Sequence, residues 1–247
     1  MSLVPDPTAA AESVQALREL NAWLAGLAAE RRVEWALESL SGAHALSSSF
    51  GAQSAVALHL ATRLRPDLPV ILVDTGHLFP ETHRFVDELT QRLGLNLHVA
   101  RPDPARAWTP AAIASLPSLG ADGIDRYNRV HKVEPMQRAL AELGVRTWIA
   151  GLRRSQASTR ASIDLLELKD GRWKLHPLAD WSDRDLGQYL ARHDLPYHPL
   201  WEQGYVSIGD MHTTRPLAPG MREEDTRFFG LKRECGLHFD EPAARRA

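Results

Sequence analysis

The 247-residue sequence contains a single cysteine, Cys235. One thiol cannot close a disulfide within its own chain, and it cannot provide the several thiolates of an all-cysteine zinc or iron–sulfur site. If Cys235 takes part in redox chemistry, a second molecule must therefore complete the reaction.

The sequence also lacks an excess of one charge and lacks long hydrophobic runs. The 29 Lys and Arg residues nearly balance the 31 Asp and Glu residues, for a net charge of −2. This balance argues against a general nucleic-acid or membrane-surface binder. Residues 1–30 combine Pro5 and Pro7 with scattered charges and no basic cluster, unlike a secretory signal or a membrane span. We therefore expect a cytoplasmic protein with neither nucleic-acid nor membrane partners.

The order of strand-like and helix-like segments indicates an α/β fold. Apolar runs typical of buried strands alternate with segments of helical spacing; we expect strands at 43–47, 70–73, 95–99 and 147–150, and helices at 53–64, 81–93 and 133–143. This alternation is typical of right-handed βαβ units, so we predict a mostly parallel, twisted sheet flanked by helices.

Other segments depart from this alternation. Residues 11–39 show helical spacing, whereas residues 101–124 are rich in Pro and Ala and are expected to form a surface excursion. A hairpin is expected at 165–175, and the next helix should begin with a capping box formed by Ser182 and Asp185.

We predict that three regions pack together as one domain. They are a helical segment (1–42), an α/β domain (43–200) and an irregular C-terminal arm (201–247) that carries Cys235. The arm is expected to be irregular because it is rich in Pro, Gly, His and charge and has little periodicity.

The first candidate binding segment is the serine loop, residues 47–54. Ligands of open parallel sheets bind where strand ends meet helix N-termini. The hydroxyls and backbone N–H groups of this loop could hold a phosphate or a sulfate; the candidates are Ser47, Ser48, Ser49, Gly51 and Ser54. The alternative is that these serines only cap the following helix.

Two further loops follow predicted strands. Asp74, Thr75 and Gly76 could recognise a ribose or a base edge, or Asp74 could simply cap the turn. The arginine loop, residues 151–160, contains three arginines and no acid. Because guanidinium groups bind phosphate bidentately, we favour an anion site there over a solvated charged loop.

Cys235 is surrounded by charged residues near the end of the chain. A lone cysteine is usually a buried, inert side chain, but this environment favours an exposed, mobile nucleophile. A pair between Cys235 and His238 is conceivable. The eleven histidines are scattered without ligand spacing, so no metal site is expected.

Several segments, in order along the chain, resemble the assimilatory phosphoadenylyl-sulfate (PAPS) reductases. Residues 234–238 (ECGLH) resemble the signature near the C-terminus of that family, and similar segments precede it at 132–136 (KVEPM), 151–160, 197–201 (YHPLW), 209–215 (GDMHTTR) and 226–233 (TRFFGLKR). The resemblance extends from about residue 47 to residue 238, and the 234–238 signature is its most specific part.

The resemblance implies a Rossmann-like fold of the adenine-nucleotide alpha hydrolase type, shared with the N-type ATP pyrophosphatases. The pyrophosphatase loop reads SGGxDS, whereas this chain reads SFGAQS at 49–54, with Phe50 in place of a glycine and Gln53 in place of the acid. An ATP-pyrophosphatase-type adenylating enzyme is therefore the less favoured alternative, and a nucleotide-sensing module without catalysis is another.

The resemblance also implies a reaction. The Cys235 thiolate would attack the sulfur of PAPS and release adenosine 3′,5′-bisphosphate, and reduced thioredoxin or glutaredoxin would then release sulfite. No bound cofactor is expected, and the family suggests a homodimer. Besides the loop residues above, the implied substrate-binding residues are Lys132, Gly151, Arg153, Arg154, Gln156, Arg160, Arg227 and His238.

A sister family, the assimilatory adenylyl-sulfate (APS) reductases, binds a [4Fe–4S] cluster through four cysteines. The corresponding positions here are Tyr127, Asn128, Asp210 and Thr213, none of which is a thiolate ligand. We therefore expect no cluster and a preference for the 3′-phosphorylated substrate. A cluster-free enzyme that acts on APS remains the alternative.

Overall fold

The computed structural model describes residues 6–238. A six-stranded sheet forms its centre, with strand order β3-β2-β1-β4-β6-β5. The strands are β1 (Ala43–Ser47), β2 (Pro69–Val73), β3 (Asn96–Ala100), β4 (Val145–Ala150), β5 (Leu166–Lys169) and β6 (Arg172–Leu175). Every pairing is parallel except the β5–β6 hairpin. The predicted α/β class with a mostly parallel sheet is confirmed.

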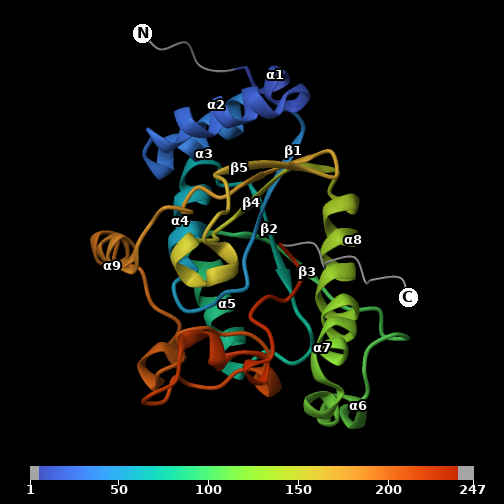
Figure 1. The fold of residues 1–247 in the computed structure, drawn as a ribbon. Coiled ribbons are helices and arrows are strands. Elements are labelled where there is room, and N and C mark those ends of the chain that lie inside the picture. Colours follow the sequence, from blue (N-terminus) through green and yellow to red (C-terminus); the bar gives the residue numbers. More distant parts are fainter. Residues whose placement is uncertain (1–5, 239–247) are drawn as a thin grey trace.

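Helices cover both faces of the sheet (Figure 1). Neighbouring side chains along a strand point to opposite faces, so each strand contributes to two cores. Leu46 and Ile149 face the larger core, which includes residues of α4 (Ala55–Leu64), α5 (Pro80–Leu93) and α9 (Asp183–Arg192). The adjacent strand residues, Ala45 and Trp148, face the opposite way and pack against α8 (Glu134–Glu142). Fully buried strands have apolar residues on both faces, as the sequence pattern predicted.

The helical spacing at 11–39 belongs to separate helices rather than a continuous one. They are α1 (Pro7–Glu12), α2 (Val14–Ala25) and α3 (Ala29–Ser39). Ser13 adopts an extended conformation and its side chain accepts a hydrogen bond from the backbone N–H of Ala16, so it caps α2. The buried Arg32 donates to both carboxylate oxygens of Asp180, each at 2.6 Å. This ion pair ties α3 to the turn that precedes α9.

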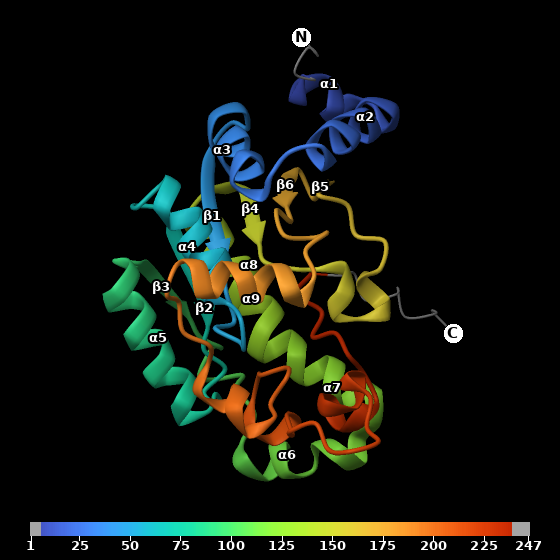
Figure 2. The same ribbon diagram turned by 90° about the vertical axis from the view of Figure 1, so that its left-hand side faces the viewer.

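The expected surface excursion at 101–124 is a misinterpretation in part. The segment contains α6 (Pro110–Ala114), and α7 (Gly120–Asn128) begins within it. Their apolar side chains form a small core with Phe228 of the C-terminal arm. Figure 2 shows the arm lying beside α6 and α7. Pro and Ala made the segment resemble a loop, but these helices are short and are stabilised by packing against the arm.

Two local predictions, the hairpin and the capping box, are confirmed. The hairpin forms between β5 and β6. The backbone N–H of Asp185 donates to Ser182 Oγ at 3.2 Å, and the Ser182 N–H donates to Asp185 Oδ2 at 2.8 Å. This capping box begins α9 at the predicted residue.

The described part of the arm, residues 201–238, contains only short 3₁₀ turns between irregular stretches. It lies at the end of the sheet opposite α1 and α2 (Figure 1). No helix among residues 6–238 is both long enough and apolar enough to cross a lipid bilayer.

A buried histidine makes the fold sensitive to acid. His198 is inaccessible to solvent; its Nδ1 accepts from the Leu200 N–H at 3.1 Å, and its Nε2 lies 3.0 Å from Thr82 Oγ1. Burial lowers the pKa of His198 to about 4. Below pH 6.5 the unfolded chain therefore binds a proton that the folded chain does not, and the free energy of unfolding falls as the pH decreases toward 4.

We predict that His198 alone removes about 2 kcal/mol of stability between pH 7 and pH 5. Urea unfolding at the two pH values measures this loss. A His198→Asn variant retains an acceptor for the Leu200 N–H but does not titrate, so its loss over the same interval should be smaller by that amount. An equal loss in the variant would contradict the assignment.

Candidate active site

A cavity of about 290 Å³ lies at the carboxyl ends of β1, β2 and β4, between the strand loops and the C-terminal arm. Most of the residues predicted from the sequence line it: Ser47, Ser48, Ser49, Gly51, Ser54, Thr75, Lys132, Gly151, Arg153, Gln156, Arg160, Arg227, Cys235 and His238. A second cavity, of about 400 Å³, lies between α8 and the hairpin and lacks both the serine loop and Cys235. The first cavity is therefore the candidate site.

Three predicted residues do not line the cavity. Asp74 accepts from the Gly76 N–H at 3.0 Å and lies 3.2 Å from Arg101 Nε. It thus caps the turn, which was the alternative interpretation of this loop, and Gly76 takes part in that turn. Arg154 donates from Nε to the carbonyl oxygen of Ile163 at 2.9 Å and stabilises the arginine loop itself.

The serine loop does not provide a side-chain cap for the helix that follows it, α4. Ser54 precedes α4, yet its side chain makes no capping hydrogen bond, and its Oγ is buried without a partner. Phe50 is buried with a φ of 49°, a left-handed conformation that is unusual for a non-glycine residue. Trp148 Nε1 donates to Ser47 Oγ at 2.7 Å and fixes the start of the loop. The unpartnered Ser54 hydroxyl lies in the cavity lining, as a ligand-binding group would.

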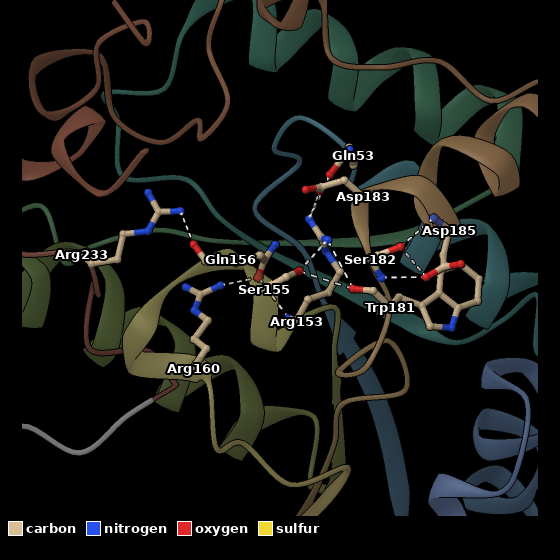
Figure 3. A network of polar contacts seen from close by, with 10 residues as sticks. All are labelled: Gln53, Arg153, Ser155, Gln156, Arg160, Trp181, Ser182, Asp183, Asp185 and Arg233. Carbon is tan, nitrogen blue, oxygen red and sulfur yellow. Dashed lines mark hydrogen bonds and ion pairs between the residues drawn. The ribbon is translucent and has the colours of Figure 1, made fainter. Parts of the chain in front are cut away.

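The positive charge of the arginine loop is largely balanced by acids from distant segments. Arg153 lies 2.8 Å from Asp183 on α9 and also donates to Gln53 at 3.2 Å (Figure 3). Arg160 forms two hydrogen bonds with Glu234, at 2.7 and 2.8 Å. The loop itself contains no acid, so sequence reasoning missed both neutralising partners.

Two other arginines at the cavity have no carboxylate within ion-pair distance among residues 6–238. Arg227 donates to Ser207 Oγ at 3.2 Å, and its Nε is buried without a partner. Arg233 donates only to the carbonyl oxygens of Gln156 and Glu223, at 3.1 and 3.4 Å. Burial lowers the pKa of Arg227, so a bound anion would offset the desolvation of its guanidinium group. These two residues favour an anionic ligand.

A buried charged network lies on one side of the cavity. Asp210 is inaccessible to solvent and accepts from Thr75 Oγ1 at 2.6 Å and from the Tyr127 hydroxyl at 3.1 Å. Lys132 Nζ lies 2.6 Å from the same carboxylate and within 5.1 Å of the Phe228 ring centre. Burial alone would raise the pKa of Asp210, but the Lys132 ammonium and the hydrogen bonds hold it well below its usual range. Asp210 is therefore ionised and fixes the position of Lys132.

Lys132 comes from a single π-helical turn, Arg129–Val133, between α7 and α8. Such turns often occur at functional sites. The network also contains Tyr127 and Asp210, two of the four positions that the sequence resemblance aligns with cluster cysteines of the APS reductases. A third, Thr213, donates its N–H to the Asp210 carbonyl at 3.1 Å. In this chain those positions support a lysine–carboxylate pair.

Cys235 lines the cavity and is half-buried, because it packs against the small core of α6, α7 and Phe228. It is thus less exposed than the sequence led us to expect, although it is not sealed in the interior. The conceivable pair with His238 does not form a hydrogen bond among the described residues. The His238 ring instead lies on Trp148, with ring centres 5.1 Å apart, and Lys174 donates to its carbonyl oxygen at 2.8 Å.

Sequence reasoning missed several residues at the cavity or in its supporting contacts: Gln53, Asp183, Trp201, Ser207, Gly209, Asp210 and Glu234. The matched segments at 197–201, 209–215 and 226–233 include some of them, but no local pattern indicates that they converge. Within residues 6–238, no group of three or more His, Cys, Asp or Glu side chains is arranged to hold a metal ion.

Known proteins resemble this chain in sequence and in fold. Residues 43–216 match the family model of the phosphoadenosine phosphosulfate reductase domain. A Xylella fastidiosa protein named phosphoadenosine 5′-phosphosulfate reductase is 64% identical over 222 residues, which cover 90% of this chain and 94% of that protein. The crystal structure of a PAPS reductase from Candida auris, in a phosphate complex, superposes with a TM-score of 0.70 and 30% identity over 82% of this chain and 98% of that chain.

A more distant structural neighbour supports the fold alone. The FMN adenylyltransferase of Candida glabrata superposes with a TM-score of 0.55 and 18% identity, covering 83% of this chain and 74% of that chain. The predicted adenine-nucleotide type of α/β fold therefore agrees with both solved structures.

Proposed function

Because this chain belongs to the phosphoadenosine phosphosulfate reductase domain family, we propose that it reduces PAPS to sulfite with Cys235 as the nucleophile. The observation that carries the proposal is the position of Cys235. This residue, the only cysteine of the sequence, lines a cavity that is also lined by the serine loop and by Arg227, whose buried Nε has no hydrogen-bond partner. The cavity thus combines a nucleophile with groups suited to a phosphate chain.

In the first step, the Cys235 thiolate attacks the sulfur of the sulfo group. A bond forms between the two sulfur atoms, and the bond from sulfur to the bridging phosphate oxygen breaks. Adenosine 3′,5′-bisphosphate leaves with that electron pair, and the enzyme retains an S-sulfocysteine. Arg227, Arg233 and Lys132 stabilise the negative charge that develops on the departing phosphate.

In the second step, a thiolate of reduced thioredoxin or glutaredoxin attacks the Cys235 sulfur. Sulfite leaves with the electron pair of the sulfur–sulfur bond, and a mixed disulfide forms. The second thiol of the partner then attacks the partner's sulfur in this disulfide, which regenerates the Cys235 thiolate and leaves the partner oxidised. Two electrons pass from the dithiol to the sulfo group, so the enzyme needs no bound redox cofactor.

The serine loop supports nucleotide binding without cleavage of ATP. Gln53 stands where the pyrophosphatase loop has an acid, and its side-chain oxygen accepts from Arg153. A neutral amide engaged in this way is a poor ligand for the Mg²⁺ ion that assists pyrophosphate release. This observation favours reduction over adenylation.

Intact-mass measurement tests the proposal. Incubation of the protein with PAPS, without a thiol partner, should add about 80 Da for one sulfo group, and reduced thioredoxin should remove it with release of sulfite. A protein that binds the nucleotide but forms no adduct would overturn the proposal and favour the sensing module. Release of pyrophosphate from ATP and Mg²⁺ would favour the adenylating enzyme.

The predicted homodimer is tested separately by sedimentation.

Gly209 makes room for Arg227, and its replacement should weaken nucleotide binding. A Cβ atom at position 209 would lie 2.2 Å from Arg227 Nη2 and 2.6 Å from its Cζ. The end of the arginine side chain must therefore move, whereas the fold need not change. We predict that Gly209→Ala lowers the affinity for adenosine 3′,5′-bisphosphate about 10- to 100-fold, the value of a charged hydrogen bond, as measured by calorimetry.

The control for this variant is Gly187→Ala on α9. A Cβ there would meet only the Tyr197 hydroxyl, at 3.4 Å, so nucleotide affinity should be unchanged. If Gly209→Ala binds the bisphosphate as tightly as the unmodified protein does, Arg227 is not a substrate-binding residue.

A further inference from the structure

Glu234 immediately precedes Cys235 and connects the C-terminal arm to the arginine loop. Its carboxylate accepts from Arg160 Nε at 2.8 Å, from Arg160 Nη2 at 2.7 Å and from Thr159 Oγ1 at 2.7 Å. The Glu234 and Arg160 side chains are only 13% and 15% exposed, so water screens the ion pair weakly.

Each of the three nitrogens of the Arg160 guanidinium makes one hydrogen bond in this arrangement. Its remaining nitrogen, Nη1, donates to the side-chain oxygen of Gln156 at 2.6 Å, and Gln156 in turn accepts from the Arg153 N–H at 3.1 Å (Figure 3). Burial alone would raise the pKa of Glu234, but the contacts with Arg160 hold it below its usual range. The carboxylate is therefore charged, and it occupies the bidentate Nε–Nη2 edge of the Arg160 guanidinium.

We propose that Glu234 is a positioning residue, which holds the Cys235 thiol at the cavity through its bidentate ion pair with Arg160. The inference rests on the proposed function, and it assigns Arg160 to the arm rather than to the substrate. Consecutive Cα atoms are about 3.8 Å apart, so a fixed Glu234 leaves Cys235 little freedom. Reacting atoms must lie close together and be aligned, and a displacement of about 1 Å can lower the rate about 100-fold.

The test uses Glu234→Gln, which keeps the shape of the side chain but removes its charge. We expect kcat for sulfite formation to fall about 10- to 100-fold, while the affinity for adenosine 3′,5′-bisphosphate stays within about threefold of the original. If Arg160 instead binds the substrate and Glu234 competes for it, nucleotide affinity would rise in this variant. That result would overturn the proposal.

The reactivity of the thiol gives a second measurement that does not require turnover. Because Cys235 is the only cysteine, alkylation by iodoacetamide reports on this residue alone. Release of Glu234 should speed alkylation of the free protein several-fold without lowering the melting temperature by more than a few degrees. Unchanged alkylation together with unchanged kcat would refute the positioning role.

Glu224 provides the matched control. It is another carboxylate of the arm that contacts the same loop, accepting from the Ser158 N–H at 3.2 Å and from Ser158 Oγ at 2.9 Å, but unlike Glu234 it is not adjacent to Cys235 in the sequence. Glu224→Gln should leave kcat and the alkylation rate unchanged. An equal effect in both variants would mean that any loosening of the arm suffices, which contradicts a specific role for Glu234.

A charge exchange distinguishes positioning from substrate contact. In the double variant Glu234→Arg with Arg160→Glu, an ion pair can form again, and part of the lost kcat should return relative to either single change. If Arg160 contacts the substrate, the exchanged protein should stay as impaired as Arg160→Glu alone. Failure of the unmodified protein to form the sulfo adduct would overturn the proposed function itself, a result distinct from any of these.

Discussion

Replacement of Cys235 by serine is expected to abolish sulfite formation while leaving nucleotide binding intact. A serine hydroxyl is not ionised near neutral pH, and an oxygen atom cannot form the sulfur–sulfur bond that the second step needs. We predict a decrease in turnover of more than about 10⁴-fold, typical for removal of a nucleophile. Sulfite release measured with excess reduced thioredoxin gives this ratio.

The same variant must still bind the product nucleotide. Cys235 and serine differ little in size, and the groups suited to the phosphates come from the serine loop, Arg227 and Arg233. Calorimetry with adenosine 3′,5′-bisphosphate should give an affinity within about threefold of the original. Substantial turnover by Cys235→Ser would contradict the covalent mechanism, and loss of nucleotide binding would mean that the exchange perturbs the cavity.

Asp210→Asn is expected to have the largest effect on stability. The change removes the only carboxylate within ion-pair distance of Lys132 among the described residues, and Lys132 is 6% exposed. A buried charge left without its partner costs about 3 to 5 kcal/mol. Urea unfolding should show this loss, and sulfite formation should fall about 100-fold or more because Lys132 is no longer fixed at the cavity.

A double variant separates the two effects. Replacing both partners, as Lys132→Met with Asp210→Asn, removes the charges together, so stability should recover relative to Asp210→Asn alone. Activity should not recover, because the cation at the cavity is missing. If the double variant is as unstable as the single one, hydrogen bonds from Thr75 and Tyr127 matter more than the ion pair does.

The sheet and its helices could be predicted from the sequence because their signals are local. Apolar runs mark the strands, and Ser182 with Asp185 marks the start of α9 through two hydrogen bonds within a single turn. The segment 101–124 was harder, since its helices are short and depend on packing against Phe228, which lies far along the chain. A local pattern carries no information about such a contact.

In the site, too, local features could be predicted from the sequence and contacts between distant residues could not. The serine loop and the arginine loop follow strands, and strand order alone brings them to one edge of the sheet. Their electrostatic partners were not predictable: Asp183 lies 30 residues from Arg153, Glu234 lies 74 residues from Arg160, and Asp210 lies 135 residues from Thr75. Asp74 is the opposite case. Its place at a strand end suggested a binding residue, but its carboxylate accepts a hydrogen bond within the following turn and does not line the cavity.

The contacts of Trp148 have a practical consequence. Its indole N–H donates to Ser47, its ring lies on His238, and Lys174 Nζ lies 4.7 Å from the ring centre. One of seven tryptophans thus contacts both the start of the serine loop and the residue three positions after the thiol. Departure of the arm would expose this indole to water and shift its fluorescence emission to longer wavelength, so Trp148 is an intrinsic optical reporter of the position of the arm.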